Sequence, residues 1–415
     1  MGEVHRGVRS PARAHRRSPV PGAAAVTGPA GERVNAPTLE VVGAGPSGLS
    51  AALAARAAGA RATVYEKRPD VGMRFHGDFQ GLENWTSDTD VLDELAGVGI
   101  DANFDCRPVY EFVCFDPGGR AHGVRSGRPI FYLVRRGSDA GTLDQGLKAQ
   151  ALQAGVEIHF SERRRRLEAG GIVAEGPHRA DAIAAGYQFE TDMADGCYGA
   201  MSEALAPGGY SYLLVDRGRG TIATCMFADF HNERQYVERT VAFFRRTVGL
   251  QWRDPRRFGG SGNFHRVATA SVGDHLYVGE APGFQDGLFG FGLRYALLSG
   301  YLAGRGGGSP EAYDRAWRAR LAGLNAVSLV NRRLFEVLGD RGRRFVIRRA
   351  VAGGDPRVLL QRIYAPAAWK LAVARWLPSR PLLGHADPVQ GCECTWCRCH
   401  RDATASAPER RRSGA

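Results

Sequence analysis

The pattern of apolar and polar positions predicts strands alternating with helices near the start of the chain. β-Branched apolar runs at 38–42 and 62–66 flank a small-residue stretch at 51–58 that has helical character. This strand–helix–strand order is the βαβ unit, in which the two strands are parallel neighbours. It favours an α/β fold class over an all-helical one.

The same patterns predict further elements along the chain. A Gly- and aromatic-rich segment at 71–85 is expected to be a loop, and 309–376 is expected to be mostly helical. The remaining expectations are helices at 90–95, 142–154, 233–248 and 292–304, and strands at 108–115, 130–134, 156–160, 210–215, 221–227 and 276–279.

A glycine-rich turn, Gly43-Ala44-Gly45-Pro46-Ser47-Gly48, follows the first predicted strand directly. Gly43 permits a tight bend, Gly45 lets the backbone approach a pyrophosphate, and Gly48 allows helix and strand to pack closely. Glu66 ends the second strand 18 residues after Gly48, where an acid that binds a ribose is expected at roughly 20 residues. Together these features predict a dinucleotide site, to which Pro46, Ser47, Lys67 and Arg68 are also assigned.

A second glycine-rich motif lies more than two hundred residues further on. The strand residue Gly279 is followed by two acids, Glu280 and Asp286, and then by a turn that opens a predicted helix. This segment resembles the second flavin-binding motif of flavoproteins with two dinucleotide-binding segments. The resemblance implies FAD rather than NAD, with contacts from Gly279, Glu280, Asp286, Gly290, Gly292 and Leu293.

From about Thr38 to Leu302 the chain resembles the geranylgeranyl reductase family, whose fold is related to that of the aromatic hydroxylases. Beyond the two flavin motifs, the segment 207–215 resembles an aromatic strand that lines an isoprenoid tunnel, so Tyr210 and Tyr212 are expected to contact substrate. Arg135 and Arg136, with the helix that follows, resemble the region beside the flavin, and Arg135 is assigned to the cofactor. The chain departs from the family pattern at Glu280, Gly287 and Val215.

The resemblance implies a Rossmann-like FAD-binding domain interleaved with an antiparallel-sheet substrate domain, followed by a helical region. The expected boundaries are a disordered extension at 1–37, a discontinuous FAD-binding domain at 38–180 and 260–308, a substrate domain at 181–259, helices at 309–385 and a Cys-rich basic tail at 386–415.

The implied reaction is reduction of carbon–carbon double bonds of an isoprenoid or related lipid by hydride transfer from reduced flavin. Titratable groups expected near the flavin are His76, Asp78 and Tyr210, and these are the candidate catalytic residues. The electron donor is left open among NADPH, quinol and a ferredoxin-like protein. Two other functions also remain open: an FAD-dependent monooxygenase or hydroxylase, and an electron-transfer flavoprotein that uses the tail.

The tail carries Cys392, Cys394, Cys397 and Cys399, with His400 next to the last of them. Cys394 and Cys397 have the CxxC spacing of a zinc knuckle or of half an iron–sulfur site. A tetrahedral site usually takes its second pair of ligands from a distant segment. Zinc, an iron–sulfur centre, a disulfide and an unstructured thiol cluster therefore all remain open for these cysteines.

The formal net charge of +12 does not by itself identify a binding partner. Arginine clusters indicate a solvated basic face or attraction to anionic lipids, and no motif supports nucleic-acid binding. The segment 365–377, with Trp369 and Trp376, has the composition of an interfacial helix, which leaves peripheral membrane association open. No signal pattern is recognised, so a cytoplasmic location is expected.

Overall fold

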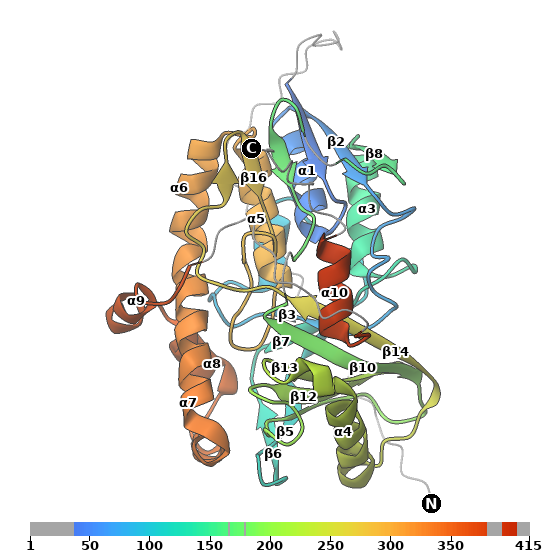
Figure 1. The fold of residues 1–415 in the computed structure, drawn as a ribbon, viewed down its shortest axis with the longest axis vertical. Helices are drawn as coiled ribbons and strands as arrows, with labels where there is room; N and C mark the ends of the chain where they lie inside the picture. The colour runs from blue at the N-terminus through green and yellow to red at the C-terminus, as the bar shows by residue number, and fades with distance from the viewer. Residues whose placement is uncertain (1–36, 165–166, 178–179, 380–391, 405–415) are drawn as a thin grey trace, which may run out of the picture. The chain divides into compact units, whose positions relative to one another are not determined.

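The computed structural model describes residues 37–164, 167–177, 180–379 and 392–404 (Figure 1). All of the predicted extension at 1–37 except Pro37 lies outside these residues. The strands are β1 (Thr38–Val42), β2 (Arg61–Glu66), β3 (Phe79–Glu83), β4 (Cys106–Val109), β5 (Glu111–Phe115), β6 (Ala121–Arg125), β7 (Phe131–Arg135), β8 (Glu157–Phe160), β9 (Gly171–Val173), β10 (Ala182–Glu190), β11 (Gly196–Ala200), β12 (Tyr210–Asp216), β13 (Arg219–Met226), β14 (Arg253–Gly262), β15 (Ser271–Val272) and β16 (His275–Tyr277). The helices are α1 (Pro46–Ala57), α2 (Val91–Gly97), α3 (Leu143–Gln153), η1 (Phe230–Asn232), α4 (Glu233–Val248), α5 (Leu293–Arg305), α6 (Pro310–Arg320), α7 (Ala322–Ala352), α8 (Pro356–Tyr364), α9 (Ala368–Ala374) and α10 (Thr395–Thr404).

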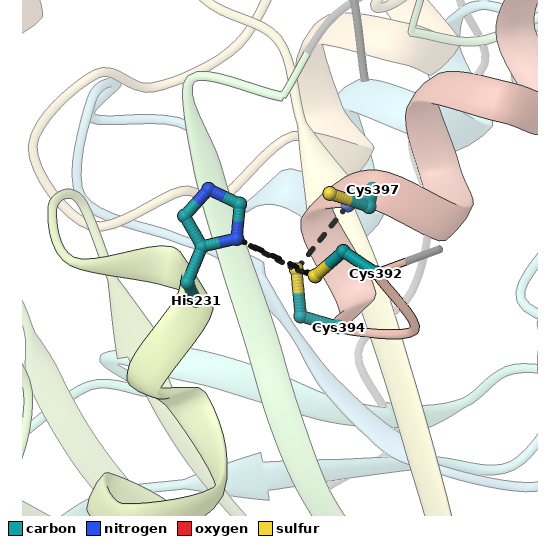
Figure 2. A group of neighbouring side chains, drawn as sticks. All are labelled: His231, Cys392, Cys394 and Cys397. Carbon is teal, nitrogen blue, oxygen red and sulfur yellow. Dashed lines mark hydrogen bonds between the residues drawn. The ribbon is translucent and has the colours of Figure 1, made fainter. Parts of the chain in front are cut away.

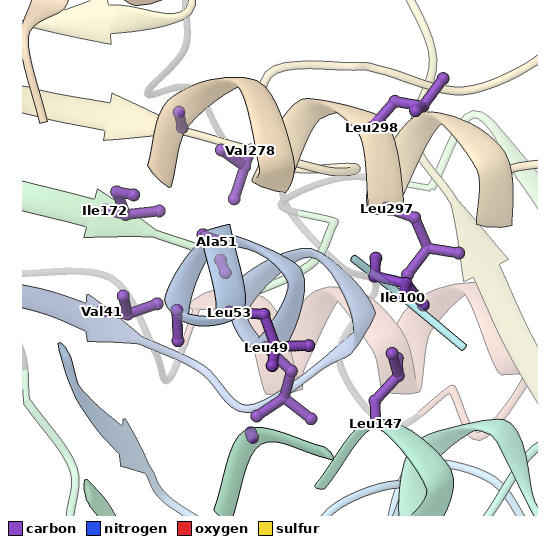
Figure 3. Close-up of a cluster of buried hydrophobic side chains, with 14 of the residues drawn as sticks. Val41, Leu49, Ala51, Leu53, Ile100, Leu147, Ile172, Val278, Leu297 and Leu298 are labelled. Carbon is purple, nitrogen blue, oxygen red and sulfur yellow. The ribbon is translucent and has the colours of Figure 1, made fainter. Parts of the chain in front are cut away.

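The first sheet confirms the predicted α/β class and its Rossmann-like unit. Its strand order is β15-β16-β9-β1-β2-β8, and β1 pairs in parallel with both β2 and β9. Val41 and Val64 stand opposite each other in register, and both are fully buried. They belong to the largest apolar core, in which side chains of the sheet meet those of α1, α3 and α5 (Figure 3).

Helices α1 and α5 pack against each other unusually closely and lie side by side in Figure 1. A Cβ at Gly300 would stand 2.0 Å from the Ser47 carbonyl oxygen, and one at Gly304 would stand 2.0 Å from that of Ala51. The Ser50 hydroxyl also donates a hydrogen bond of 2.6 Å to the carbonyl oxygen of Leu297. Small residues therefore bring together the helices that follow the two glycine-rich motifs.

The second sheet has the order β14-β10-β13-β12-β11-β5-β6 and is largely antiparallel. The predicted hairpin is present, with Leu213 opposite Ile222 across β12 and β13. Alternate side chains of β12 point to opposite faces, as expected for a strand with period two. Leu213 and Val215 pack in the core that α4 closes with Phe244. The other face of β12 is left for Tyr210, Tyr212 and Leu214.

A small third sheet, β3-β7-β4, corrects two sequence expectations. The segment predicted as a loop at 71–85 contains β3, because Phe79–Glu83 pairs with a strand more than fifty residues away, β7. The predicted strand 108–115 is divided between two sheets: β4 pairs with β7, whereas β5 pairs with β6 and β11. In both cases the secondary structure depends on strand pairing with segments that are distant in the sequence.

The C-terminal region is helical, as predicted. Helix α7 is interrupted at Gly339, which has a φ of 53°, and α8 and α9 both pack against α7. Helix α10 was not predicted; it contacts β14, β10 and η1. Within the described ranges, no helix is both long and apolar enough to cross a membrane.

Candidate functional site

The first glycine turn has the geometry that its sequence predicts. Gly43 has a φ of +98°, and a Cβ there would meet the Ala174 carbonyl oxygen at 2.5 Å. A Cβ at Gly48 would lie 1.9 Å from the Gly43 carbonyl oxygen, so turn and helix require glycine at both positions. At Gly45, by contrast, a Cβ would meet no atom within 4 Å. The open side of the turn is therefore at Gly45, where a ligand can approach the backbone.

Glu66 stands at the end of β2 beside this turn. One carboxylate oxygen accepts a hydrogen bond of 2.9 Å from the backbone N–H of Ala44, and the other accepts one of 3.0 Å from that of Arg68. A carboxylate has about four lone-pair positions, so capacity remains for hydroxyl donors of a ligand. Glu66 thus stiffens the turn and can also bind a ribose.

Both glycine-rich motifs line a single cavity of about 1270 Å³. Ser47 touches the second motif directly, since a Cβ at Gly279, whose φ is +66°, would lie 2.8 Å from the Ser47 hydroxyl oxygen. Most of the predicted cofactor residues lie in the cavity wall: Gly43, Gly45, Pro46, Ser47, Glu66, Lys67, Arg68, Gly279, Glu280, Gly290, Gly292 and Leu293. Gly48 does not line the cavity but packs beneath the turn.

Glu280 faces the cavity and is held by Arg74. The guanidinium of Arg74 lies 3.4 Å from a Glu280 carboxylate oxygen and donates a hydrogen bond of 2.6 Å to the Ser261 carbonyl oxygen. Burial raises the pKa of Glu280, and Arg74 opposes that rise. Glu280, one of the positions where the chain departs from the family pattern, is therefore a half-buried hydrogen-bonding group in the cavity wall.

Besides Gly48, two predicted cofactor residues lie away from the cavity wall, namely Arg135 and Asp286. Arg135 pairs with Asp105 at 2.9 Å and also donates to the Ala140 carbonyl oxygen. Asp286 is buried under the second motif, where its carboxylate accepts hydrogen bonds from the backbone N–H groups of Leu288 and Phe289. The geometry gives Asp286 the role of shaping this turn, since it does not reach the cavity.

Arg136 occupies the place that the sequence assigned to Arg135. It lines the cavity and is buried, with a bidentate pair to Asp144 at 2.9 and 2.8 Å and a hydrogen bond to Gln80. The Asp144 carboxylate raises the pKa of Arg136, although burial acts in the opposite direction. Side chains alternate along β7, so a shift of one residue decides which arginine faces the site.

The far end of the cavity is aromatic and apolar. Tyr210, Tyr212 and Leu214 line it from β12, whereas Val215 points to the opposite face and is absent from the wall. The departure from the family pattern at Val215 therefore does not alter the wall. Further apolar side chains come from β5–β7, the second motif and the C-terminal helices: Phe112, Val124, Ile130, Phe131, Phe289, Phe291, Phe335, Leu338, Val346, Leu360, Ile363 and Trp369.

The three candidate catalytic residues all line the cavity. Asp78 is 3% exposed, and its carboxylate accepts hydrogen bonds from the His76 backbone N–H at 3.1 Å and the Gln80 amide at 3.2 Å. Burial is the main cause that raises the pKa of Asp78. His76 is exposed, and the Tyr210 hydroxyl donates a hydrogen bond to the Phe289 carbonyl oxygen. Asp78 is thus a buried carboxyl group in the cavity wall, whose pKa burial raises and whose hydrogen bonds from His76 and Gln80 oppose that rise.

The cysteines of the tail gather outside this cavity with one residue that the sequence did not suggest. Cys392, Cys394 and Cys397 meet His231, which belongs to η1 (Figure 2). The side chain of Cys399 lies outside the described part of the chain. No sequence motif surrounds His231, and only the packing of α10 against β14 and β10 of the second sheet reveals it.

Comparisons with known proteins agree with this architecture. A family model described as "NAD(P)-binding Rossmann-like domain" matches residues 41–81. No curated protein matches the chain in sequence. One similar solved structure is a geranylgeranyl bacteriochlorophyll reductase-like protein from Thermoplasma acidophilum, with a TM-score of 0.62 and 18% identity over 82% of this chain and 96% of that one.

Other similar solved structures belong to proteins that are described as catalysing different reactions. A flavin-dependent brominase has a TM-score of 0.58 and 14% identity, covering 81% of this chain and 97% of its own. A 2-methyl-3-hydroxypyridine-5-carboxylic acid oxygenase has a TM-score of 0.52 and 15% identity, covering 80% and 98%. The chain therefore has the fold that these reductase-like, brominase and oxygenase structures share, with a Rossmann-like domain at its first glycine turn.

Proposed function

We propose that the protein is an FAD-dependent oxidoreductase that reduces carbon–carbon double bonds of an isoprenoid or related lipid. One observation carries the proposal: a single cavity runs from the two glycine-rich motifs to the aromatic face of β12. Its volume of about 1270 Å³ exceeds the roughly 300–1,000 Å³ of common small-molecule sites, which suits a dinucleotide together with a substrate.

The residues at the first end of the cavity fit FAD. The open backbone at Gly45 lies at the N-terminus of α1, where free N–H groups and the helix dipole favour a pyrophosphate. Glu66 has remaining acceptor capacity for a ribose, and the Glu280 carboxylate in the cavity wall would offer acceptors to the ribityl hydroxyls. Gln285 also lines the cavity, and its amide oxygen is buried without a partner among the described residues, as expected of a group that awaits a ligand.

The residues at the far end fit an apolar substrate. The wall there consists mainly of aromatic and aliphatic side chains, such as Tyr212, Phe131 and Phe335. A lipid chain would bury apolar surface in this end at roughly 25 cal/mol per Å². The likeness to a geranylgeranyl bacteriochlorophyll reductase-like structure supports the same substrate class.

Reduction of a double bond requires a hydride on one carbon and a proton on the other. Reduced FAD supplies the hydride when it is bound. Asp78 is a buried carboxyl group in the cavity wall, and burial raises its pKa, although hydrogen bonds from His76 and Gln80 and the charge of Arg136 oppose that rise. We therefore assign the proton donor to Asp78.

The mouth of the cavity supports a lipid substrate drawn from a membrane surface. Leu338, Val346 and Trp369 line the cavity and are also 42%, 39% and 55% exposed. Trp369 belongs to α9, whereas Leu338 and Val346 belong to α7, which also carries exposed arginines such as Arg344 and Arg348. Apolar side chains beside cations suit the surface of an anionic bilayer. We expect the protein to co-sediment with anionic vesicles but not with neutral ones. If it co-sediments with neither kind of vesicle, the proposal that the substrate is drawn from a membrane surface is contradicted.

The substrate proposal is tested by anaerobic reoxidation of the reduced protein. Polyprenyl alcohols or diphosphates should reoxidise the bound flavin and give products two mass units heavier per double bond reduced. If no polyprenyl compound reoxidises the flavin, while oxygen together with an aromatic substrate gives a hydroxylated product, the fold serves an oxygenase instead. Chemically reduced protein serves in this test because NADPH, quinol and a ferredoxin-like donor all remain open.

A further inference from the structure

The cluster of His231, Cys392, Cys394 and Cys397 unites two segments about 160 residues apart. One ligand atom of each residue lies within 4.8 Å of the others. The His231 Nδ1 atom is 3.5 Å from the sulfur of Cys392 and 3.5 Å from that of Cys394 (Figure 2). The sulfurs of Cys392 and Cys394 are 3.3 Å apart. Three thiols and an imidazole thus surround one point.

The three separations of 3.3–3.5 Å are close to the edges of a tetrahedron around one metal ion. Zinc binds cysteine sulfur at about 2.3 Å and histidine nitrogen at about 2.0 Å, so ligand atoms of a tetrahedral site lie roughly 3.5–3.8 Å apart. An iron–sulfur cluster spreads its four protein ligands over at least two irons, which places some of the ligand atoms further apart than the edges around one metal ion. A disulfide would require about 2.05 Å between two sulfurs. The spacing favours a single ion over both alternatives.

The surroundings of the cluster have the features of a structural metal site. The backbone N–H of Cys397 points at the Cys394 sulfur at 3.5 Å, the hydrogen bond expected for a thiolate acceptor at the start of a helix. The ring of Trp396 packs edge-on against that of His231, with centroids 5.4 Å apart. The ligand set is complete at four, without an open position for substrate, which is typical of structural rather than catalytic zinc.

The segment that the cluster holds lies against the wall of the cavity. The Thr395 backbone N–H donates a hydrogen bond of 2.8 Å to Glu233, the first residue of α4. The Thr395 side chain covers Gly259 on β14, where a Cβ would lie 2.4 Å from its hydroxyl oxygen. Gly259 itself lines the cavity. Helix α10 contacts both the edge strand β14 and its neighbour β10, so it packs on one face of the second sheet beside this edge.

The geometry points to a structural zinc site formed by His231, Cys392, Cys394 and Cys397, which fastens α10 onto β14 and β10 of the second sheet. It replaces the sequence expectation of a site built from the tail cysteines alone. His231 supplies the distant ligand that a CxxC pair usually needs. The proposed zinc site lies outside the cavity that is assigned to the flavin. The role of the tail in this proposal is therefore structural and not electron transfer.

Metal analysis of the purified full-length protein tests this assignment. We expect about one zinc per chain, independent of flavin content, and its loss in Cys394→Ser and in His231→Ala. The matched control is Cys106→Ser, which alters a half-buried cysteine on β4 and should keep the metal. Flavin absorbance, measured on each variant, reports folding separately, so failure of the flavin proposal is distinguishable from failure of the zinc site.

Cobalt substitution provides a second test, and its first part uses the wild-type protein and does not depend on the folding of a variant. Wild-type protein stripped by a chelator and refilled with Co²⁺ should show thiolate-to-cobalt charge transfer and the visible bands of a tetrahedral ion. His231→Cys should retain one ion with a shifted spectrum. No metal uptake by the stripped wild type, retention of zinc in both ligand variants, or iron with labile sulfide in place of zinc would each overturn the assignment.

Discussion

The carbonyl oxygen of Ser47 lies 2.0 Å from the position that a Cβ of Gly300 would take. Ser47 belongs to the first glycine turn, and Gly300 lies in the helix that follows the second motif. Their contact joins segments that are more than two hundred residues apart in sequence. The cofactor end of the cavity therefore depends on close packing between α1 and α5.

Gly300→Ala should disrupt this packing. The added methyl group meets backbone atoms, which cannot move aside as a flexible side chain can, so helix α5 must shift. Overpacking of this kind costs about 1–3 kcal/mol, and we expect that loss in the free energy of unfolding together with weaker flavin retention. Denaturant unfolding and flavin content measure both effects.

Gly97→Ala is the matched control for this substitution. Gly97 ends α2, and a Cβ there would meet no atom within 4 Å. Alanine favours the helix more than glycine does, so this variant should be as stable as the wild type or slightly more stable. Equal stability of Gly300→Ala and Gly97→Ala would show that the contact between α1 and α5 is unimportant.

Glu66→Ala tests the ribose contact. Hydrogen bonds that involve a charged group contribute about 1.5–3 kcal/mol, so the dissociation constant for FAD should rise roughly 10- to 100-fold. The exposed Glu238 of α4 offers a control, since Glu238→Ala removes a carboxylate far from the turn. Titration of apoprotein with FAD gives both constants. Unchanged affinity in Glu66→Ala would remove Glu66 from the site.

Asp286 should make stability depend on pH. Burial raises its pKa from 3.8 to about 6, so in this range the folded state binds more protons than the unfolded state. The free energy of unfolding therefore falls as pH rises through this window and is constant above it. The contribution is about 2–3 kcal/mol, from roughly two pKa units at about 1.4 kcal/mol each.

The Asp286→Asn variant should lack this part of the slope. Denaturant unfolding between about pH 4 and pH 6.5 measures the difference between wild type and variant at each pH. Tyr364→Phe provides a further check, because the Tyr364 hydroxyl donates to Asp286 at 2.9 Å and lowers its pKa. That variant should extend the slope to higher pH. Parallel curves for all three proteins would contradict the assignment.

Asp78→Asn should separate proton delivery from flavin reduction. The amide cannot donate a carboxyl proton, so substrate turnover should fall by about 10²- to 10⁴-fold while reduction of the flavin by dithionite stays unchanged. In the wild type, turnover should decrease as pH rises through the raised pKa of Asp78, and the variant should lose that dependence. Tyr212→Phe keeps the carboxyl group and should keep the pH profile; a loss of the profile there would move the donor to the tyrosine.

The parts of the fold that local patterns determine could be predicted from the sequence. The glycine turn and Glu66 lie within one βαβ unit, where spacing alone brings them together. The β12–β13 hairpin is likewise local. Strand β3 was missed because its residues pair with β7, and its apolar content resembles that of a loop rich in aromatics.

The orientation of individual side chains, and contacts between residues far apart in the sequence, could not be predicted. The choice between Arg135 and Arg136 depends on the register of one strand. Asp286 looked like a cofactor ligand, yet it faces the backbone of its own turn. His231 has no recognisable motif, and its meeting with the cysteines follows from the way α10 packs against β14 and β10. These facts belong to tertiary structure, which a single sequence does not display.

The most direct test of the central claim is the absorption spectrum of the purified protein, with identification of the cofactor released on denaturation. The account predicts the two visible bands of an oxidised flavin and about one FAD per chain. A colourless protein that takes up no FAD on reconstitution would contradict it.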